Sequence, residues 1–185
     1  LHRMKNATKT VRIGLGGKYV ELPDAYKSIN ESLFQAATYN DRKLDLQYIH
    51  SEKLNSGNVD AMLSSLDGVL IAPGFGQRGI EGKFIALKYA REHDIPTFGV
   101  CLGMQCMVIE YARDVLGYTD ANSTEMDVTT KHNVIDLMEE QKSITNMGGT
   151  MRLGAYDCIL AEDSIAAKAY GNDPYSRTAS PSFRI

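Results

Sequence analysis

The segment Gly99-Val100-Cys101-Leu102-Gly103 constrains the fold of this chain more than any other. An apolar run over residues 95–98 leads into it, and a helical pattern of apolar residues follows it. A glycine on each side of Cys101 lets the backbone turn sharply from a strand into a helix and hold the central residue out on the bend. The spacing matches the nucleophile elbow G-x-S-x-G, with sulfur in place of oxygen. The segment therefore predicts a strand, a tight bend that carries Cys101, and a helix.

Cys101 is a candidate nucleophile because of this position. At the start of a helix the macrodipole favours the thiolate, which is the form that attacks carbon. Attack on a carbonyl also needs two backbone N–H groups for the oxyanion, and a base for the proton. Elbow geometry assigns one N–H to Leu102, and the Gly-rich turn of the neighbouring strand offers Gly74 for the other. A buried structural cysteine is the alternative interpretation of Cys101, and an ordinary tight turn is that of residues 73–76.

Composition limits the kinds of partner that we expect. The 185 residues have a net charge of −3, with 43% hydrophobic and 23% charged residues, as in one soluble globular domain. This balance gives no electrostatic reason to expect nucleic acid or a membrane as a partner, and no apolar run approaches transmembrane length. The three cysteines are spaced for neither a disulfide framework nor a zinc site. We therefore expect no metal and a reducing, cytoplasmic location.

Hydrophobic periodicity predicts strands that alternate with helices. Strands are expected over residues 11–15, 44–48, 68–71 and 95–100, and helices over residues 25–38, 80–92 and 103–113. Asp24 is the expected N-cap of the first helix, and Met104, Met107, Val108 and Tyr111 are expected to face inward from the last. The alternation implies an α/β fold with a mostly parallel central sheet and flanking helices. Both Gly-rich turns, residues 73–76 and 99–103, fall where ligands bind in such sheets.

The pattern changes after Asn122. Strands expected over residues 133–137, 150–153 and 156–160 predict a small antiparallel flap, and residues 164–170 predict a short helix. Residues 1–10 are basic and polar, as in a linker. The start at Leu1 suggests a piece of a longer protein.

Residues 99–105, Gly-Val-Cys-Leu-Gly-Met-Gln, resemble the nucleophile motif of the class I (triad) glutamine amidotransferases. Four further stretches occur in the same order as in the CTP synthase branch of that family and are similar to it: residues 17–28, 72–79, 121–127 and 149–155. The resemblance covers roughly residues 11–171, which we interpret as the amidotransferase domain. Residues 1–10 would be a linker remnant. Residues 172–185 would be an aberrant tail, which its Ser, Pro and Thr content predicts to be disordered.

The resemblance implies a role for each candidate residue. Cys101 would attack the side-chain amide of L-glutamine, form a glutamyl thioester and release ammonia. Gly74 and Leu102 would form the oxyanion hole. The rest of the glutamine site would consist of Gly103, Met104, Gln105 and Glu125. Gln105 and Glu125 would hold the amino-acid end of the substrate, with Glu125 pairing with its ammonium group.

The resemblance also implies partners. The ammonia would pass to an amidoligase (synthetase) domain, which would precede Leu1 in the full-length chain and would aminate UTP to CTP with ATP and Mg²⁺. No cofactor is expected in the amidotransferase domain itself. GTP is the family's activator of the glutamine reaction, and the loop over residues 18–26 and Arg78 are candidates for that role. The full-length enzyme is expected to be a homo-oligomer.

Two segments of the family are missing from these residues. The family completes its triad with a downstream His-Pro-Glu motif, and an Arg-His-Arg-His-Arg segment before it supplies an arginine to glutamine. None of the four histidines (His2, His50, His93 and His132) belongs to such a motif. Without a triad partner, a nucleophile loses most of its rate, so we expect negligible glutaminase activity from this chain.

The sequence of the tail, residues 172–185, indicates why these segments are missing. Residues 176–185 can be back-translated, with allowed codons, so that a shift of one base reads Arg-Glu-Arg-His-Arg-His-Arg-Phe-Glu. We therefore predict a frameshift near Asp173, in the gene or in its sequence record. Two alternatives for the whole chain remain open: an amidotransferase subunit of another synthetase, such as one making GMP or carbamoyl phosphate, and a non-catalytic binding fragment.

Overall fold

The computed structural model describes residues 7–22, 24–74, 76–137, 155–161, 163–170, 175–179 and 183–184. The chain forms two compact units, Leu1–Val134 and Ile135–Ile185. All of the predicted site residues lie in the first unit. Among the described residues, every helix is too short or too polar to span a lipid bilayer.

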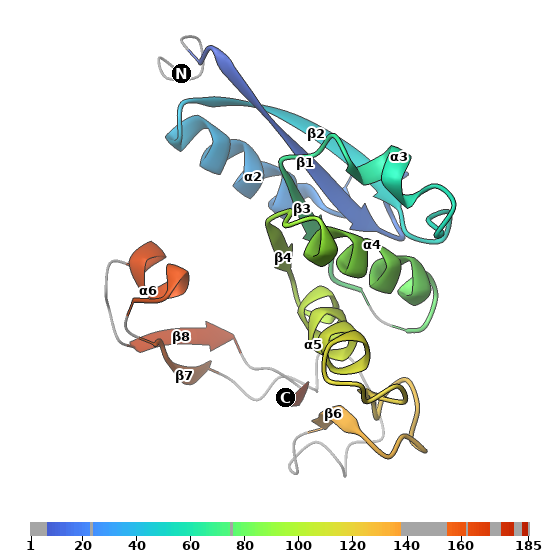
Figure 1. Ribbon diagram of the computed structural model, residues 1–185. Helices are drawn as coiled ribbons and strands as arrows, with labels where there is room; N and C mark the ends of the chain where they lie inside the picture. Colours follow the sequence, from blue (N-terminus) through green and yellow to red (C-terminus); the bar gives the residue numbers. More distant parts are fainter. Residues whose placement is uncertain are drawn as a thin grey trace. The chain divides into compact units, whose positions relative to one another are not determined.

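A four-stranded parallel sheet forms the centre of the first unit (Figure 1). Its strands, in the spatial order β2-β1-β3-β4, are β2 (Arg42–His50), β1 (Lys9–Gly17), β3 (Gly68–Ile71) and β4 (Thr97–Gly99). Ile71, the last residue of β3, lies opposite Gly16 of β1 and Gly99 of β4. The carboxyl ends of these strands therefore meet at one edge of the sheet, as the predicted α/β fold requires.

Helices cover both faces of this sheet (Figure 1). They are α2 (Lys27–Tyr39), α3 (Val59–Leu63), α4 (Ile80–Glu92) and α5 (Leu102–Asp114). Two successive residues of β3 show which helices cover which face of the sheet, because successive side chains of a strand point in opposite directions. Ile71 belongs to the apolar cluster of α3, α4 and α5, whereas Leu70 clusters with Leu33 of α2. The sheet thus lies between α2 and the other three helices.

The first helix begins later than the sequence predicts. Its N-cap is Tyr26 rather than Asp24, and no side chain caps it. Tyr26 is buried, and its hydroxyl accepts a hydrogen bond from the Tyr19 N–H at 3.2 Å. The prediction was wrong because the burial of Tyr26, which depends on distant residues, sets the start of the helix.

The buried face of α5 also differs from the prediction. Of the residues expected to face inward, Met107 packs against the core cluster, but Met104 and Tyr111 are exposed. Leu102, Cys106 and Ile109 are buried instead. The rotation of this helix is set at its first turn, where Gly103 lies against the end of β3. Met104 points to solvent as a result.

The second unit contains short antiparallel pairs. β7 (Ala155–Ile159) pairs with β8 (Tyr175–Ala179), and Asp136 of β6 (Asn133–Leu137) lies opposite Arg184 of β9 (Phe183–Arg184). α6 (Ile165–Ala169) is capped by Ser164, whose hydroxyl accepts from the Ala167 N–H at 3.0 Å. The tail was expected to be disordered, but β8 is a strand, because pairing with β7 satisfies its backbone groups whatever its side chains are. The strand expected over residues 150–153 lies outside the described residues.

Candidate active site

Cys101 occupies the bend between β4 and α5. Its backbone has φ 55° and ψ −114°, a conformation that residues with a side chain rarely adopt and that is found mainly at functional sites. It is the N-cap residue of α5, and its carbonyl accepts from the Gln105 N–H at 3.1 Å. The side chain is exposed. The sulfur is therefore accessible at the start of the helix, as an elbow nucleophile must be.

Two close backbone approaches explain the glycines that flank Cys101. A Cβ on Gly103 would lie 2.1 Å from the Ile71 carbonyl oxygen, and a Cβ on Gly99 would lie 2.5 Å from the Met104 nitrogen. The Val100 N–H donates to the same Ile71 carbonyl at 3.0 Å. The elbow therefore rests directly on the end of β3, with no side chain between the two backbones.

The turn after β3 carries Gly74, the second predicted oxyanion donor. Its φ of 148° lies in the region that favours glycine. Two lysines border this turn. The Lys83 ammonium donates to the carbonyl of Ala72 at 2.9 Å, and a Cβ on Gly74 would lie 3.2 Å from the Cε of Lys18. The sequence analysis assigned neither lysine to the glutamine site.

Glu125 lies in a turn that follows β5 (Asn122–Ser123). Its N–H donates to the Ser123 hydroxyl at 3.2 Å, and the Met126 N–H donates to the Ser123 carbonyl at 3.0 Å. The side-chain amide of Gln77 donates to the Met126 carbonyl at 2.7 Å. This bond ties the Glu125 turn to the segment after Gly74, so the structure brings the two predicted turns together.

The charged groups around these turns influence one another. Burial raises the pKa of the Glu125 carboxyl, and the positive charge of Lys18 opposes that rise. Burial lowers the pKa of Lys83, and the Lys18 ammonium adds to this effect. Lys83 is only 1% exposed and Lys18 only 7%. Two buried lysines and the half-buried carboxyl of Glu125 thus lie around these turns.

The first turn of α5 contains the other predicted residues. Leu102 and Gly103 are buried, whereas Met104 is exposed. Gln105 is 6% exposed, and its Oε1 atom has no hydrogen-bond partner among the described residues. A buried acceptor without a protein donor is unusual in a folded protein.

The second cysteine of α5 has a different environment. Cys106 is fully buried, and burial raises the pKa of its thiol to about 11. It therefore remains protonated at neutral pH. Among the residues that the structure describes, no three His, Cys, Asp or Glu side chains gather as a metal site would need.

The structure places two further residues near the site, Lys18 and Lys83, which the sequence analysis did not assign to it. Lys18 directly follows the carboxyl end of β1, a position where open sheets place ligand contacts, so the sequence did contain an indication that it lies near the site. Lys83 had none, because a lysine in a helix ordinarily reaches solvent.

A family model described as Glutamine amidotransferase class-I matches residues 21–180. The chain belongs to the class-I glutamine amidotransferase family. The family match extends past residue 171, where the sequence analysis expected the resemblance to end.

Curated relatives with high sequence identity to this chain include CTP synthases. The CTP synthase of Bacteroides fragilis is 69% identical over 170 residues, which cover 92% of this chain and 32% of that protein. That of Porphyromonas gingivalis is 63% identical over 173 residues, or 94% of this chain and 32% of that protein. The chain thus spans about a third of the length of these curated relatives.

A solved structure is similar over most of the amidotransferase. It is the glutaminase domain of Trypanosoma brucei CTPS with bound acivicin, with a TM-score of 0.84 and 36% sequence identity. The match covers 95% of this chain and 68% of that one. The prediction of an amidotransferase domain of the CTP synthase type is confirmed.

Proposed function

We propose that this chain is the glutamine-hydrolysing domain of an enzyme that makes CTP. The observation that carries the proposal is the exposed Cys101 on a strained bend, held on β3 by contacts that only glycine permits. The identity with CTP synthases supports the choice of this branch over an amidotransferase of another synthetase.

The proposed reaction begins with the thiolate of Cys101. Its sulfur bonds to the side-chain amide carbon of glutamine, the C–N bond breaks, and the nitrogen leaves as ammonia after taking up a proton. Water then cleaves the thioester to glutamate. The N–H groups of Leu102 and Gly74 would hold the oxyanion. Glu125 and the unpartnered Oε1 of Gln105 would accept from the substrate's ammonium group, whose donors suit both acceptors.

The partners of the reaction are part of the same proposal. Ammonia would pass to a synthetase domain of the full-length protein, which would aminate UTP with ATP and Mg²⁺. GTP would activate the glutamine reaction, and the full-length protein would be a homo-oligomer. The free thiols of Cys101 and Cys106 support a reducing, cytoplasmic location.

We further propose that the chain of 185 residues hydrolyses glutamine only negligibly. It contains no His-Pro-Glu motif that could manage the proton. Ammonia release from glutamine, measured at saturating glutamine, should stay close to the background of a Cys101→Ser variant. Release at a rate typical of enzymes, on the order of 10 turnovers per second, would contradict the proposal.

The frameshift near Asp173 is a separate proposal, supported by the reading of residues 176–185 in the next frame. Sequencing the coding DNA around that codon tests it. We expect codons that give the Arg-His-Arg-His-Arg segment when the frame moves by one base. Codons that cannot give that reading would refute it.

Covalent labelling tests the site independently of turnover. Acivicin, the compound bound to the Trypanosoma brucei domain, should modify Cys101 and leave Cys106 unmodified, as measured by peptide mass spectrometry. Cys106→Ser is the matched control and should label like the unaltered chain. Inertness of Cys101, or labelling of Cys106 instead, would favour a non-catalytic fragment.

A further inference from the structure

Lys83 lies on the buried face of α4, and the proposed reaction gives it no role. Its side chain is 1% exposed, although a lysine in a helix ordinarily reaches solvent. Its Nζ atom donates a hydrogen bond to the Ala72 carbonyl at 2.9 Å. Burial of an amine is costly, and the bond to Ala72 offsets part of that cost. What this bond does for the molecule is therefore the question that Lys83 raises.

The backbone that carries Lys83 is held close to the chain after β2. A Cβ on the neighbouring Gly82 would lie 1.8 Å from the Ser51 carbonyl oxygen, so the two backbones are in contact. The Lys83 N–H donates to the Gly79 carbonyl at 3.3 Å. Both ends of the lysine, its backbone and its Nζ atom, are therefore fixed relative to the sheet.

Ala72 is the residue between the end of β3 and the turn that carries Gly74. It is fully buried, and its N–H donates to the Gly16 carbonyl of β1 at 2.8 Å. Its own carbonyl accepts from Lys83 of α4. The residue before it, Ile71, is the one on which the elbow rests. Both polar groups of Ala72 are thus held by other elements, next to the elbow.

Covalent geometry carries this constraint from Ala72 to Gly74. The peptide bond between Ala72 and Pro73 is planar, so the carbonyl that Lys83 holds also sets the orientation of the Pro73 nitrogen. The pyrrolidine ring fixes φ of Pro73. The ψ angle of Pro73 is then the only soft dihedral before the next peptide plane, which contains the Gly74 N–H. The direction of that N–H therefore depends on the bond that Lys83 makes.

From this arrangement we propose that Lys83 is a positioning residue for the reaction: by holding the Ala72 carbonyl, it aims the Gly74 N–H at the oxyanion. The inference rests on the proposed function, because Gly74 is an oxyanion donor only if Cys101 attacks an amide. A donor that is already oriented stabilises a developing charge without having to move as the charge forms. Loss of Lys83 should therefore slow those reactions of Cys101 in which negative charge develops beside the attacked carbon.

Two electrophiles separate this role from general support of the fold. In acivicin, the Cys101 sulfur bonds to the carbon of a C=N group, negative charge develops on the nitrogen, and chloride leaves. In iodoacetamide, the sulfur displaces iodide from a saturated carbon, and no such charge forms. The rates at which each reagent labels Cys101 in the 185-residue chain are measured by peptide mass spectrometry.

The variants are Lys83→Met and Lys83→Leu, which remove the donor and keep an apolar side chain in the buried position. Acivicin should label Cys101 about tenfold or more slowly in both, a smaller factor than the loss of an oxyanion donor itself causes. The iodoacetamide rate should not change. The matched control is Lys88→Met on the same helix, whose lysine is 47% exposed and pairs with Asp114. It should label like the unaltered chain with both reagents.

The ratio of the two labelling rates decides the outcome. An unchanged ratio in either Lys83 variant that still unfolds cooperatively in urea would overturn the inference, including the case in which both rates fall equally. Loss of folding in both variants would also overturn it, because Lys83 would then be required for the fold. If acivicin does not label the unaltered chain, the proposed glutamine site itself fails. Labelling of the unaltered chain, with the same ratio in the variants, refutes this inference alone.

Discussion

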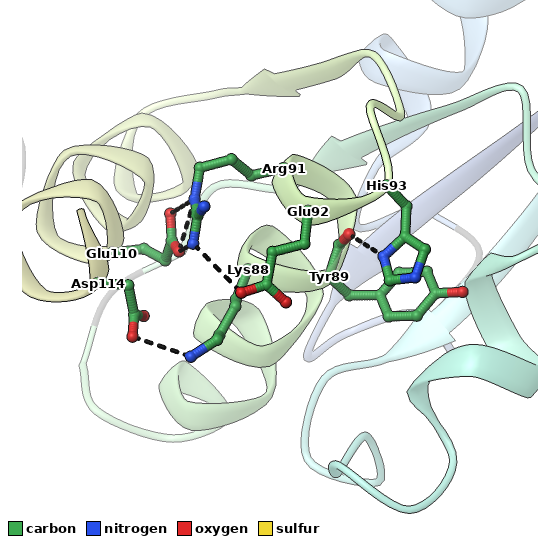
Figure 2. A network of polar contacts seen from close by, with 7 residues as sticks. All are labelled: Lys88, Tyr89, Arg91, Glu92, His93, Glu110 and Asp114. Carbon is green, nitrogen blue, oxygen red and sulfur yellow. Dashed lines mark hydrogen bonds and ion pairs between the residues drawn. The ribbon is translucent and has the colours of Figure 1, made fainter.

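The two ends of α5 are held against their neighbours by different means. At the first turn the backbone of Gly103 lies against the Ile71 carbonyl of β3, with no side chain between them. Further along, side-chain ion pairs join α5 to α4 (Figure 2). Arg91 donates to Glu110 at 2.7 Å through Nη2 and at 3.1 Å through Nε, and Lys88 pairs with Asp114 at 3.0 Å.

The difference shows that the first turn of α5, next to Cys101, is positioned more tightly than the rest of the helix. A backbone contact leaves no side-chain freedom, so it fixes the position of the neighbouring Cys101 closely. The ion pairs are adjustable. The Glu110 side chain is only 4% exposed and is stabilised by two-point contact with Arg91, whose side chain is 32% exposed. Charged partners can tolerate small shifts that the elbow cannot.

Gly103→Ala should break the elbow end and have the largest effect. Its Cβ would meet the Ile71 carbonyl at 2.1 Å, so β3 and α5 must separate. We expect a loss of about 3 kcal/mol or more in the free energy of unfolding, measured with urea. Gly57→Ala is the control, because its Cβ would meet only the end of the Asn55 side chain, at 3.2 Å. Equal losses in both variants would show that the elbow contact is not special.

Glu110→Gln should weaken the ion-pair end by a smaller amount. The variant keeps the size of the side chain but removes the charge that Arg91 contacts. We expect a loss of about 1–2 kcal/mol, since Arg91 can still reach water. Glu92→Gln is the control on the same arginine, because Glu92 lies 3.8 Å from Arg91 and is half exposed. A Glu110→Gln loss as large as that of Gly103→Ala would remove the distinction between the two ends.

Glu125→Gln should stabilise the fold at neutral pH. Burial raises the pKa of Glu125 above the ordinary value of 4.5. Between 4.5 and the raised value, the unfolded chain has lost a proton that the folded chain keeps, so stability falls as pH rises through this window. The variant should match the unaltered chain near pH 4 and exceed it at pH 7 in urea unfolding. The same gain at both pH values would contradict this account.

Asp114→Asn should have the smallest effect. Its partner Lys88 lies at the surface, where water and salt screen the pair. We expect the urea midpoint to change little at low salt and not measurably at high salt. A clear loss that persists at high salt would show that this outer pair helps to hold α5 in place.

Local patterns predicted much of this molecule. The bounds of α4, Ile80–Glu92, follow from its periodicity, and Gly99 and Gly103 predicted the bend on which Cys101 lies exposed. Glu125 was predicted as a site residue from the family resemblance alone. The roles of these site residues stay predictions until glutamine binding is measured.

Other features depend on contacts between distant residues. Tyr26 displaced the expected cap at Asp24 because it is buried in the core. The prediction for α5 was wrong for Met104 and Tyr111 but not for Met107, because the contact of Gly103 with β3 sets the helix rotation. Neither contact shows in the helical periodicity of the residues around it.

By itself, the sequence determined the order of strands and helices and the position of the bend, since both depend on residues close together in the chain. Only the tertiary structure decided that Lys18 and Lys83 are buried beside Gly74. The physical reason is that burial of a charge is a property of packed neighbours. These neighbours come from β1, β3 and α4, which the chain brings together only when the sheet forms.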